Sequence, residues 1–185
     1  MHVIPFPELD DVTEQQVYTH AGSFSPPGFS VLDVVGTVRF HKDPVYGYQL
    51  FKKVRNALGT GADLAQYSMV MATTTVVNRS VDLAASGTKT WKLAGILHSY
   101  ESAAHPGLKD GYVGWARIWG DGPCIADAHP LVAGEVALCH NASGTLGRLN
   151  KTTGADSDGM YVGYFTSGTA AAAGETISCF LNRIQ

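Results

Sequence analysis

The stretch AGEVALC, residues 133–139, recurs later in the chain as AGETISC, residues 173–179. In both copies a glycine, which tolerates a positive φ angle, and an acidic residue that can cap a turn come before a short run that ends in cysteine. This arrangement is typical of a turn that leads into a β-strand. Strands that recur at a spacing of about 8–12 residues, with turn signals between them, indicate an antiparallel β-sandwich or β-barrel.

Most of the sequence after residue 30 has the same β-type pattern. Apolar and polar residues tend to alternate, β-branched residues are frequent, and glycine-containing turns separate the runs. We expect long strands at residues 31–40, 48–54, 67–77, 91–97 and 112–120, and shorter ones at 123–126, 135–140, 146–149, 160–165 and 175–181. In the last of the long runs, Val113, Trp115 and Arg117 share one face.

The first thirty residues differ from the rest. Four prolines lie there, and because proline fixes φ and lacks a backbone donor, the segment cannot form a regular ladder throughout. We expect residues 1–30 to be an extended arm that precedes a mainly β domain, residues 31–185, of jelly-roll-like or β-tulip-like form. The side chains expected to anchor the arm, on its own domain or on a neighbouring subunit, are Phe6, Phe24, Pro26, Pro27 and Phe29.

The chain carries few charges. Charged residues make up 16% of it, against about 25% in an average globular protein. The net charge is −3, and the lysines and arginines form no basic stripe. Binding to nucleic acid requires many such residues to neutralise phosphates, so we expect no nucleic-acid partner. A surface with few charges also does less to keep a chain monomeric, which favours association with other subunits.

No apolar run in the sequence approaches the roughly 20 residues that span a bilayer. The N-terminal residues lack the basic segment and the long apolar stretch of a secretory signal. We therefore expect a chain that has no membrane partner and is made in a cytoplasm.

The familiar catalytic motifs are missing from the sequence. It contains no phosphate-binding GxxxxGK[ST] loop, no GxSxG nucleophile elbow and no zinc-binding HExxH pair. The seven histidines are scattered, and none forms a metal-ligand pair at short spacing. We expect a structural protein rather than an enzyme, with no catalytic residue, metal ion or cofactor. An enzyme or metal site assembled from residues on distant strands is the alternative that spacing alone leaves open.

The three cysteines are Cys124, Cys139 and Cys179. An odd number at wide spacing without a CxxC pair is typical of buried free thiols in a chain made in a reducing compartment. Cys139 and Cys179 end the two copies of the repeated segment, so they could lie on neighbouring strands and face the same side. A disulfide between these two residues is therefore the alternative.

The order of several turn and strand motifs resembles that of a known family. These motifs are GADL at residues 61–64, LAGI at 93–96, GYVGWARIWG at 111–120, VAGE at 132–135, and VGY at 162–164 followed by AGET at 173–176. The chain is similar in this respect to the small β proteins that decorate the heads of tailed bacteriophages, called decoration or cement proteins. The resemblance covers about the last three-quarters of the chain and does not include the arm.

The resemblance implies a virion protein, synthesised in the host cytoplasm, that binds the capsid surface. Such a protein clamps the joints between major capsid proteins and is commonly a homotrimer. Its partners would be the major capsid protein and further copies of itself.

The aromatic residues suggest a second function. Trp115 and Trp119 lie in one strand run and could form a stacking platform for sugars, or pack in the core or at an interface. The alternative function is therefore a carbohydrate-binding or receptor-binding β-sandwich module of a phage or bacterial surface structure.

Overall fold

A computed structural model describes residues 16–17, 35–56, 62–73, 80–83, 93–98, 107–127, 131–139, 146–151, 160–168 and 174–182. The strands are β1 (Gln16–Val17), β2 (Val38–Asp43), β3 (Gly47–Asn56), β4 (Leu64–Ala65), β5 (Met69–Ala72), β6 (Ser80–Leu83), β7 (Leu93–Leu97), β8 (Gly107–Leu108), β9 (Tyr112–Trp119), β10 (Pro123–Ile125), β11 (Val136–Cys139), β12 (Leu149–Lys151), β13 (Met160–Phe165) and β14 (Thr176–Leu181).

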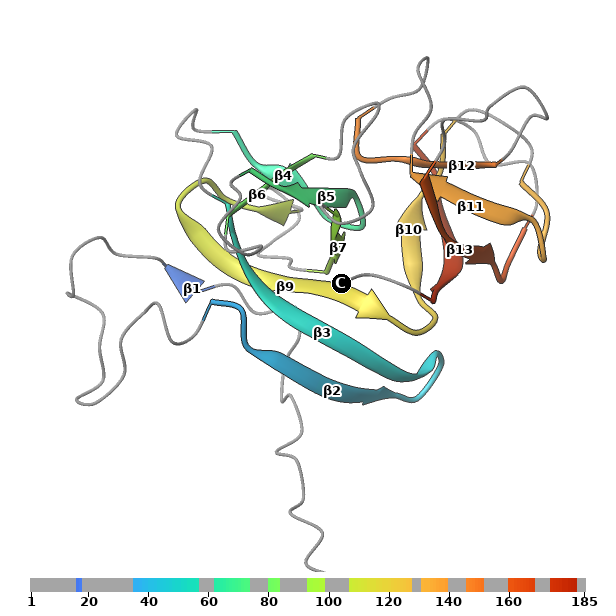
Figure 1. Ribbon diagram of the computed structural model, residues 1–185, viewed down its shortest axis with the longest axis horizontal. Coiled ribbons are helices and arrows are strands. Elements are labelled where there is room, and N and C mark those ends of the chain that lie inside the picture. Colours follow the sequence, from blue (N-terminus) through green and yellow to red (C-terminus); the bar gives the residue numbers. More distant parts are fainter. Residues whose placement is uncertain are drawn as a thin grey trace, which may run out of the picture.

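The fold is mainly β, as the sequence predicts. The described residues form strands, turns and bends and contain no helix, so none of them belongs to a helix that could cross a membrane. Almost all strand pairs are antiparallel, and the exception is the short parallel pairing of β3 with β6. Figure 1 shows the long curved strands β3 and β9 side by side, with β10 to β13 gathered at one end of them.

The first sheet closes on itself. Its seven strands follow the order β1-β9-β7-β5-β6-β3-β2, and a further pairing joins β9 to β3. This pairing completes a ring of β9, β7, β5, β6 and β3, while β2 lies outside the ring along the first half of β3. One cluster of buried hydrophobic side chains is built mostly from these five strands, and its members include Val54, Val70, Ala94 and Ala116.

The second sheet has five strands in the order β10-β14-β13-β11-β12. Its two edge strands also meet, because Ala126, which follows β10, forms a parallel bridge with Leu149 of β12. The N–H of Asp127 donates to the carbonyl of Leu149 over 2.9 Å at the same place. The second sheet is therefore almost closed as well.

A shared core holds the two sheets together. It combines Met69, Leu93 and Ile96 of the first sheet with side chains of the second, such as Phe165 and Leu181, all of them buried. Backbone hydrogen bonds reinforce this contact, including a reciprocal pair between Gly120 and Leu181, each 3.0 Å long. The described strands thus form a β-sandwich-like pair of sheets, one of which is a closed ring, together with a small two-stranded sheet of β4 and β8.

The strand boundaries agree with the sequence predictions for the clearest runs and differ elsewhere. The strand predicted at residues 31–40 begins only at Val38, and residues 31–34 lie outside the described part. Gly36 has a φ of 92° and its N–H donates to the carbonyl of Lys53, so the chain turns there before the strand starts. The short strands β1, β4, β6 and β8 were not predicted.

The β2–β3 hairpin is made by a compact turn. The Asp43 carboxylate accepts hydrogen bonds from the N–H groups of Val45 and Tyr46, at 2.7 and 2.9 Å. Gly47 follows with a φ of 77°, which an L side chain adopts only at a cost. A three-residue loop closed by a left-handed glycine is a common hairpin connection, and it presents the end of this hairpin to solvent.

Candidate docking surface

A line of apolar side chains crosses both sheets on the outside of the molecule. Strand register places Val136 opposite Tyr164, Tyr164 opposite Phe180, Trp119 opposite Leu50, and Leu50 opposite Phe40. Residues directly opposite one another in an antiparallel pair lie on the same face of the sheet. We call this line the aromatic stripe; its members are Phe40, Leu50, Trp119, Phe180, Tyr164 and Val136.

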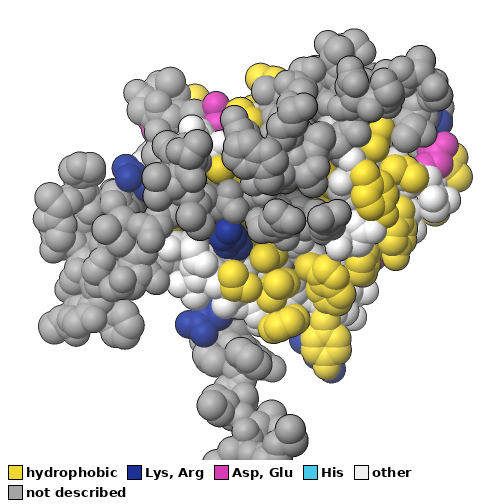
Figure 2. Space-filling model, in the orientation of Figure 1, with side chains coloured by type: hydrophobic (Ala, Val, Ile, Leu, Met, Phe, Trp, Pro, Cys, Tyr) yellow, Lys and Arg dark blue, Asp and Glu magenta, His cyan; other side chains and the backbone are white. Residues whose placement is uncertain are grey.

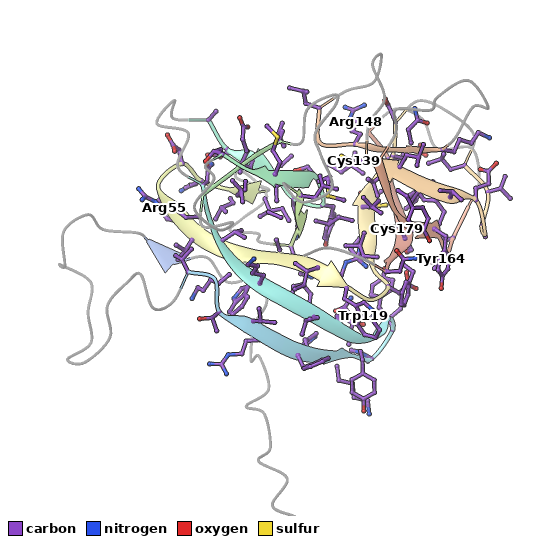
Figure 3. All side chains as sticks on the ribbon, viewed as in Figure 1. Arg55, Trp119, Cys139, Arg148, Tyr164 and Cys179 are labelled. Atoms are coloured by element: carbon purple, nitrogen blue, oxygen red, sulfur yellow. The ribbon has the colours of Figure 1, made fainter. Side chains whose placement is uncertain are left out.

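Ring contacts make the stripe continuous where it passes from one sheet to the other. The rings of Trp119 and Phe180 meet edge to face with centroids 5.5 Å apart, and Phe180 stacks on Tyr164 at 5.3 Å with an interplanar angle of 12°. Trp119 and Tyr164 remain 38% and 39% exposed. Figure 3 labels both of them at the end of the molecule where the two sheets meet.

The stripe is apolar over its length, and charged groups lie at its ends. Figure 2 shows hydrophobic side chains gathered over the end of the β2–β3 hairpin and continuing towards the second sheet. At the hairpin end, Lys42 lies over the ring of Tyr48, 5.7 Å from its centroid, and Tyr48 is 61% exposed. A partner that covers the stripe would therefore displace water from few charged groups, and the free-energy cost of their desolvation would be small.

An ion pair lies beside the opposite end of the stripe, next to Val136. The Glu135 carboxylate accepts a 2.8 Å hydrogen bond from the N–H of Val132 and a 3.2 Å bond from Lys151 Nζ. The backbone hydrogen bond, followed by the lysine contact, lowers the pKa of Glu135 below its ordinary value. The acid of the repeated AGE turn is thus charged and held in place by the turn that it caps.

The two tryptophans named from the sequence have different positions. Trp115 is only 6% exposed and lies beneath Lys53, whose Nζ is 5.2 Å from the ring centroid. It also packs with Phe51 in a small buried cluster. Trp115 is therefore an interior residue and cannot form a stacking platform together with Trp119, which belongs to the stripe.

A β-bulge explains why the two side chains differ. In the pairing of β3 with β9, Phe51 lies opposite Arg117 but Leu50 lies opposite Trp119, so Ile118 is an extra residue. Because each bulged residue reverses the alternation of faces, Trp119 lies on the face opposite to Arg117 although they are two positions apart. A strict period of two would have placed Trp119 inward with Arg117.

Arg117 joins the two sheets beneath the stripe. It lies in β9, is fully buried, and donates to four backbone carbonyls at 2.9 to 3.1 Å. The acceptors are the carbonyl oxygens of Gly120, Gly122, Pro123 and Cys179. Because one of these carbonyls belongs to β14, the guanidinium fixes the position of the second sheet relative to β9.

The glycine at position 122 makes room for this guanidinium. A Cβ atom on Gly122 would lie 2.6 Å from Arg117 Nη1 and 2.8 Å from Gln49 Nε2, and its φ is 151°. Gln49 is itself buried and donates from Nε2 to the carbonyl of Asp121 over 2.6 Å. The two glycines after Trp119, Gly120 and Gly122, are visible in the sequence. Nothing in the sequence, however, identifies Arg117 as the residue that packs against them.

All three cysteines are buried free thiols. Cys139 and Cys179 do not lie on neighbouring strands, because β13 runs between β11 and β14. The alternative of a disulfide between them is therefore wrong. Burial raises the pKa of Cys139 to about 12, whereas Cys179 lies next to Arg117, with its sulfur 3.6 Å from Nη2. Figure 3 labels both cysteines in the second sheet.

The predicted arm contacts cannot be compared with the structure. Phe6, Phe24, Pro26, Pro27 and Phe29 lie outside the described residues. Within residues 1–30 the structure describes only Gln16 and Val17, which pair with Val113 and Tyr112 of β9. The arm and its anchors stay a prediction.

The described residues give no sign of a metal centre, because no group of three or more His, Cys, Asp or Glu side chains among them could hold an ion. What the surface offers is the aromatic stripe, a line of apolar side chains that crosses both sheets. The sequence matches no protein-family model. No curated protein is significantly similar to it.

Proposed function

We propose that this chain is a structural protein of a tailed bacteriophage particle, which binds the outer surface of the capsid and stabilises the joints between major capsid proteins. The observation that supports this most directly is the aromatic stripe, since a contiguous exposed apolar surface is typical of a site for another protein. In this proposal the chain makes and breaks no covalent bond, and its work is mechanical.

Burial of the stripe would supply binding energy. Complete burial of one large apolar side chain contributes about 1.5–3 kcal/mol. Val136, Trp119 and Tyr164 have 37%, 38% and 39% of their surface exposed, so each would contribute about 1 kcal/mol when a partner covers it. Three such contributions correspond to roughly a hundredfold in affinity.

The resemblance of the sequence to phage decoration proteins supports the choice of partner. It implies a location on the virion surface and assembly with copies of the same chain, commonly as a homotrimer. The low content of charged residues, 16% of the chain, is consistent with a protein that works in an assembly rather than alone.

The second candidate function is a carbohydrate-binding or receptor-binding module, and the exposure of Trp119 favours it. A sugar stacks on an open aromatic face, however, and in the stripe the rings cover one another. Tyr164 and Phe180 stack face to face, and the contact of Phe180 with Trp119 covers a further ring surface. We therefore favour a protein partner over a glycan.

The experiment is a binding assay with capsid shells assembled from the major capsid protein of the same virus without this chain. The native chain should co-sediment with the shells, and the double variant Trp119→Ser with Tyr164→Ser should bind at least tenfold more weakly. Leu146→Ser is the matched control, because Leu146 is 51% exposed but does not belong to the stripe.

Three outcomes would count against the proposal. The native chain could fail to bind the shells, the double variant could bind as well as the native chain, or the chain could bind a glycan array in a manner that Trp119→Ser abolishes. The last result would establish the carbohydrate-binding alternative.

A further inference from the structure

The positive charge of Arg117 is buried, and no carboxylate among the described residues forms an ion pair with it. Within the described part of the chain, its partners are the four backbone carbonyls named above and the sulfur of Cys179. A guanidinium does not lose its proton in a protein. Because an uncompensated charge in the interior is strongly destabilising, the surroundings of Arg117 are expected to supply an anion.

The carboxylate that is closest in the sequence, that of Asp121, makes no direct hydrogen bond with Arg117. Asp121 Oδ1 accepts hydrogen bonds from the N–H of Gly122 at 2.8 Å and from Thr166 Oγ1 at 2.6 Å. Among the described contacts of Arg117, the one group that can ionise to an anion is the Cys179 thiol, 3.6 Å from Nη2.

A second thiol lies against the first. Cys124 pairs with Ile177 in the ladder of β10 and β14, so it lies diagonally across from Cys179 on the same face of the sheet. Both side chains are fully buried, so the two thiol groups lie together in the interior. A thiol that donates to a thiolate stabilises its charge as a charge-assisted hydrogen bond does.

We propose that Cys179 carries a thiolate that serves as the internal counter-ion of Arg117, and that Cys124 donates its S–H to that thiolate. The guanidinium and the thiolate together then form a buried ion pair at the joint of the two sheets. This gives the interior a group whose charge depends on pH, in a position where the second sheet is held to β9.

The directions of the pKa shifts agree with this arrangement. Burial raises the pKa of Cys179, but the hydrogen bond from Cys124 and the charge of Arg117 outweigh it, so the pKa lies below the ordinary 9.0. Burial raises the pKa of Cys124 well above 9.0, and the hydrogen bond to Cys179 adds to the rise. Asp121, the other charged group that acts on both, opposes ionisation of each.

The sign of the stability effect follows from these directions. Between the folded-state pKa of Cys179 and its unfolded value near 9.0, the unfolded chain binds the proton more readily than the folded chain. The free energy of unfolding therefore rises with pH through that window. In the opposite direction, this contribution to stability is lost as pH falls from 9.0 through the folded-state pKa of Cys179, because the protonated thiol no longer compensates Arg117.

The test is a titration of thiolate absorption in the ultraviolet, on the full native chain and on Cys179→Ser and Cys139→Ser variants. At neutral pH the native chain should carry one thiolate, Cys179→Ser should lose it, and Cys139→Ser should keep it. Raman spectra of the native chain give an independent reading, with S–H bands from two of the three cysteines.

The proposal is overturned if the native chain shows S–H bands from all its cysteines at neutral pH, or if Cys139→Ser removes the thiolate signal and Cys179→Ser does not. The Raman measurement needs no variant, so it decides the question even where Cys179→Ser does not fold.

Discussion

The ring of Trp119 in β9 meets the ring of Phe180 in β14 edge to face, with centroids 5.5 Å apart and an interplanar angle of 78°. This contact carries the aromatic stripe from the first sheet to the second. A partner bound to the stripe would therefore contact both sheets at once, and its binding would depend on how firmly they are joined.

The first prediction concerns the energy of this ring pair. In a double-mutant cycle of Trp119→Leu and Phe180→Leu, we expect a coupling of about 0.5–1.5 kcal/mol, as for other aromatic pairs. Urea denaturation of the four proteins measures it. A cycle of Trp119→Leu with Leu146→Ala, residues for which the structure gives no contact, should be additive to within about 0.5 kcal/mol, and equal coupling in both cycles would contradict the prediction.

The second prediction concerns the arginine at the joint. Arg117→Met removes the guanidinium from four carbonyl oxygens and the Cys179 sulfur, although the carbonyls of Gly120, Gly122 and Cys179 keep a backbone N–H donor. The variant should lower the free energy of unfolding by about 3–5 kcal/mol. Arg39→Met is the control, because Arg39 is partly exposed on β2 and its loss should change stability by about 0.5 kcal/mol at most. A similar decrease in the free energy of unfolding in both variants would show that Arg117 does not hold the two sheets together.

The third prediction separates backbone strain from steric conflict at Gly122. Gly122→Ala would place a methyl group 2.6 Å from Arg117 Nη1 and should destabilise by several kcal/mol. Gly134→Ala provides the comparison: Gly134 has a φ of 89° with nothing within 4 Å of its Cβ position, so it should cost only the 1–2 kcal/mol, roughly, of a left-handed alanine. Thermal or urea unfolding gives both values.

The fourth prediction is a loss of stability at high pH. Burial raises the pKa of Cys139 to about 12, so ionisation of this thiol favours the unfolded chain once pH exceeds the ordinary 9.0. The free energy of unfolding should fall with pH above that value, by at most about 1.4 kcal/mol per pH unit for this group. Cys139→Ala should show a shallower fall than the native chain; parallel curves would mean that Cys139 is accessible to solvent.

The fifth prediction concerns the arm. If Phe6, Phe24 and Phe29 anchor the chain on the shell, their combined replacement by serine should weaken shell binding while the urea midpoint of the β domain stays unchanged. Unchanged binding would remove the arm from the attachment surface. A lowered midpoint would show that the arm packs on its own domain instead.

The sequence predicts the strands well where the alternation is long and undisturbed. The run at residues 48–54 lies within β3, the run at 112–120 corresponds to β9, and the run at 160–165 coincides with β13. In these segments β-branched and aromatic residues fit the pleated surface and neighbouring turns mark the ends. The shared face of Val113, Trp115 and Arg117 is confirmed as well, since all three are buried and their β3 partners alternate.

The candidate surface was only partly predictable. Trp119 was among the predicted residues, but its separation from Trp115 depends on the bulge at Ile118, and a bulge arises from pairing with β3 rather than from β9 alone. Phe180 joins the stripe through its ring contact with Trp119, which lies on a strand distant in the chain, and Tyr164 also joins it through its pairing with Val136 of β11. Such contacts leave no periodic signal in either strand.

The near closure of the second sheet limits how this molecule can aggregate. Its outermost strands meet at the bridge between Ala126 and Leu149, so little unpaired backbone remains there to template strand addition by another chain. Polymerisation by strand addition to that sheet is thereby suppressed, even though the aromatic stripe leaves apolar side chains exposed. Any association on that side has to proceed through matching side chains, which is the kind of recognition that can discriminate one neighbour from another.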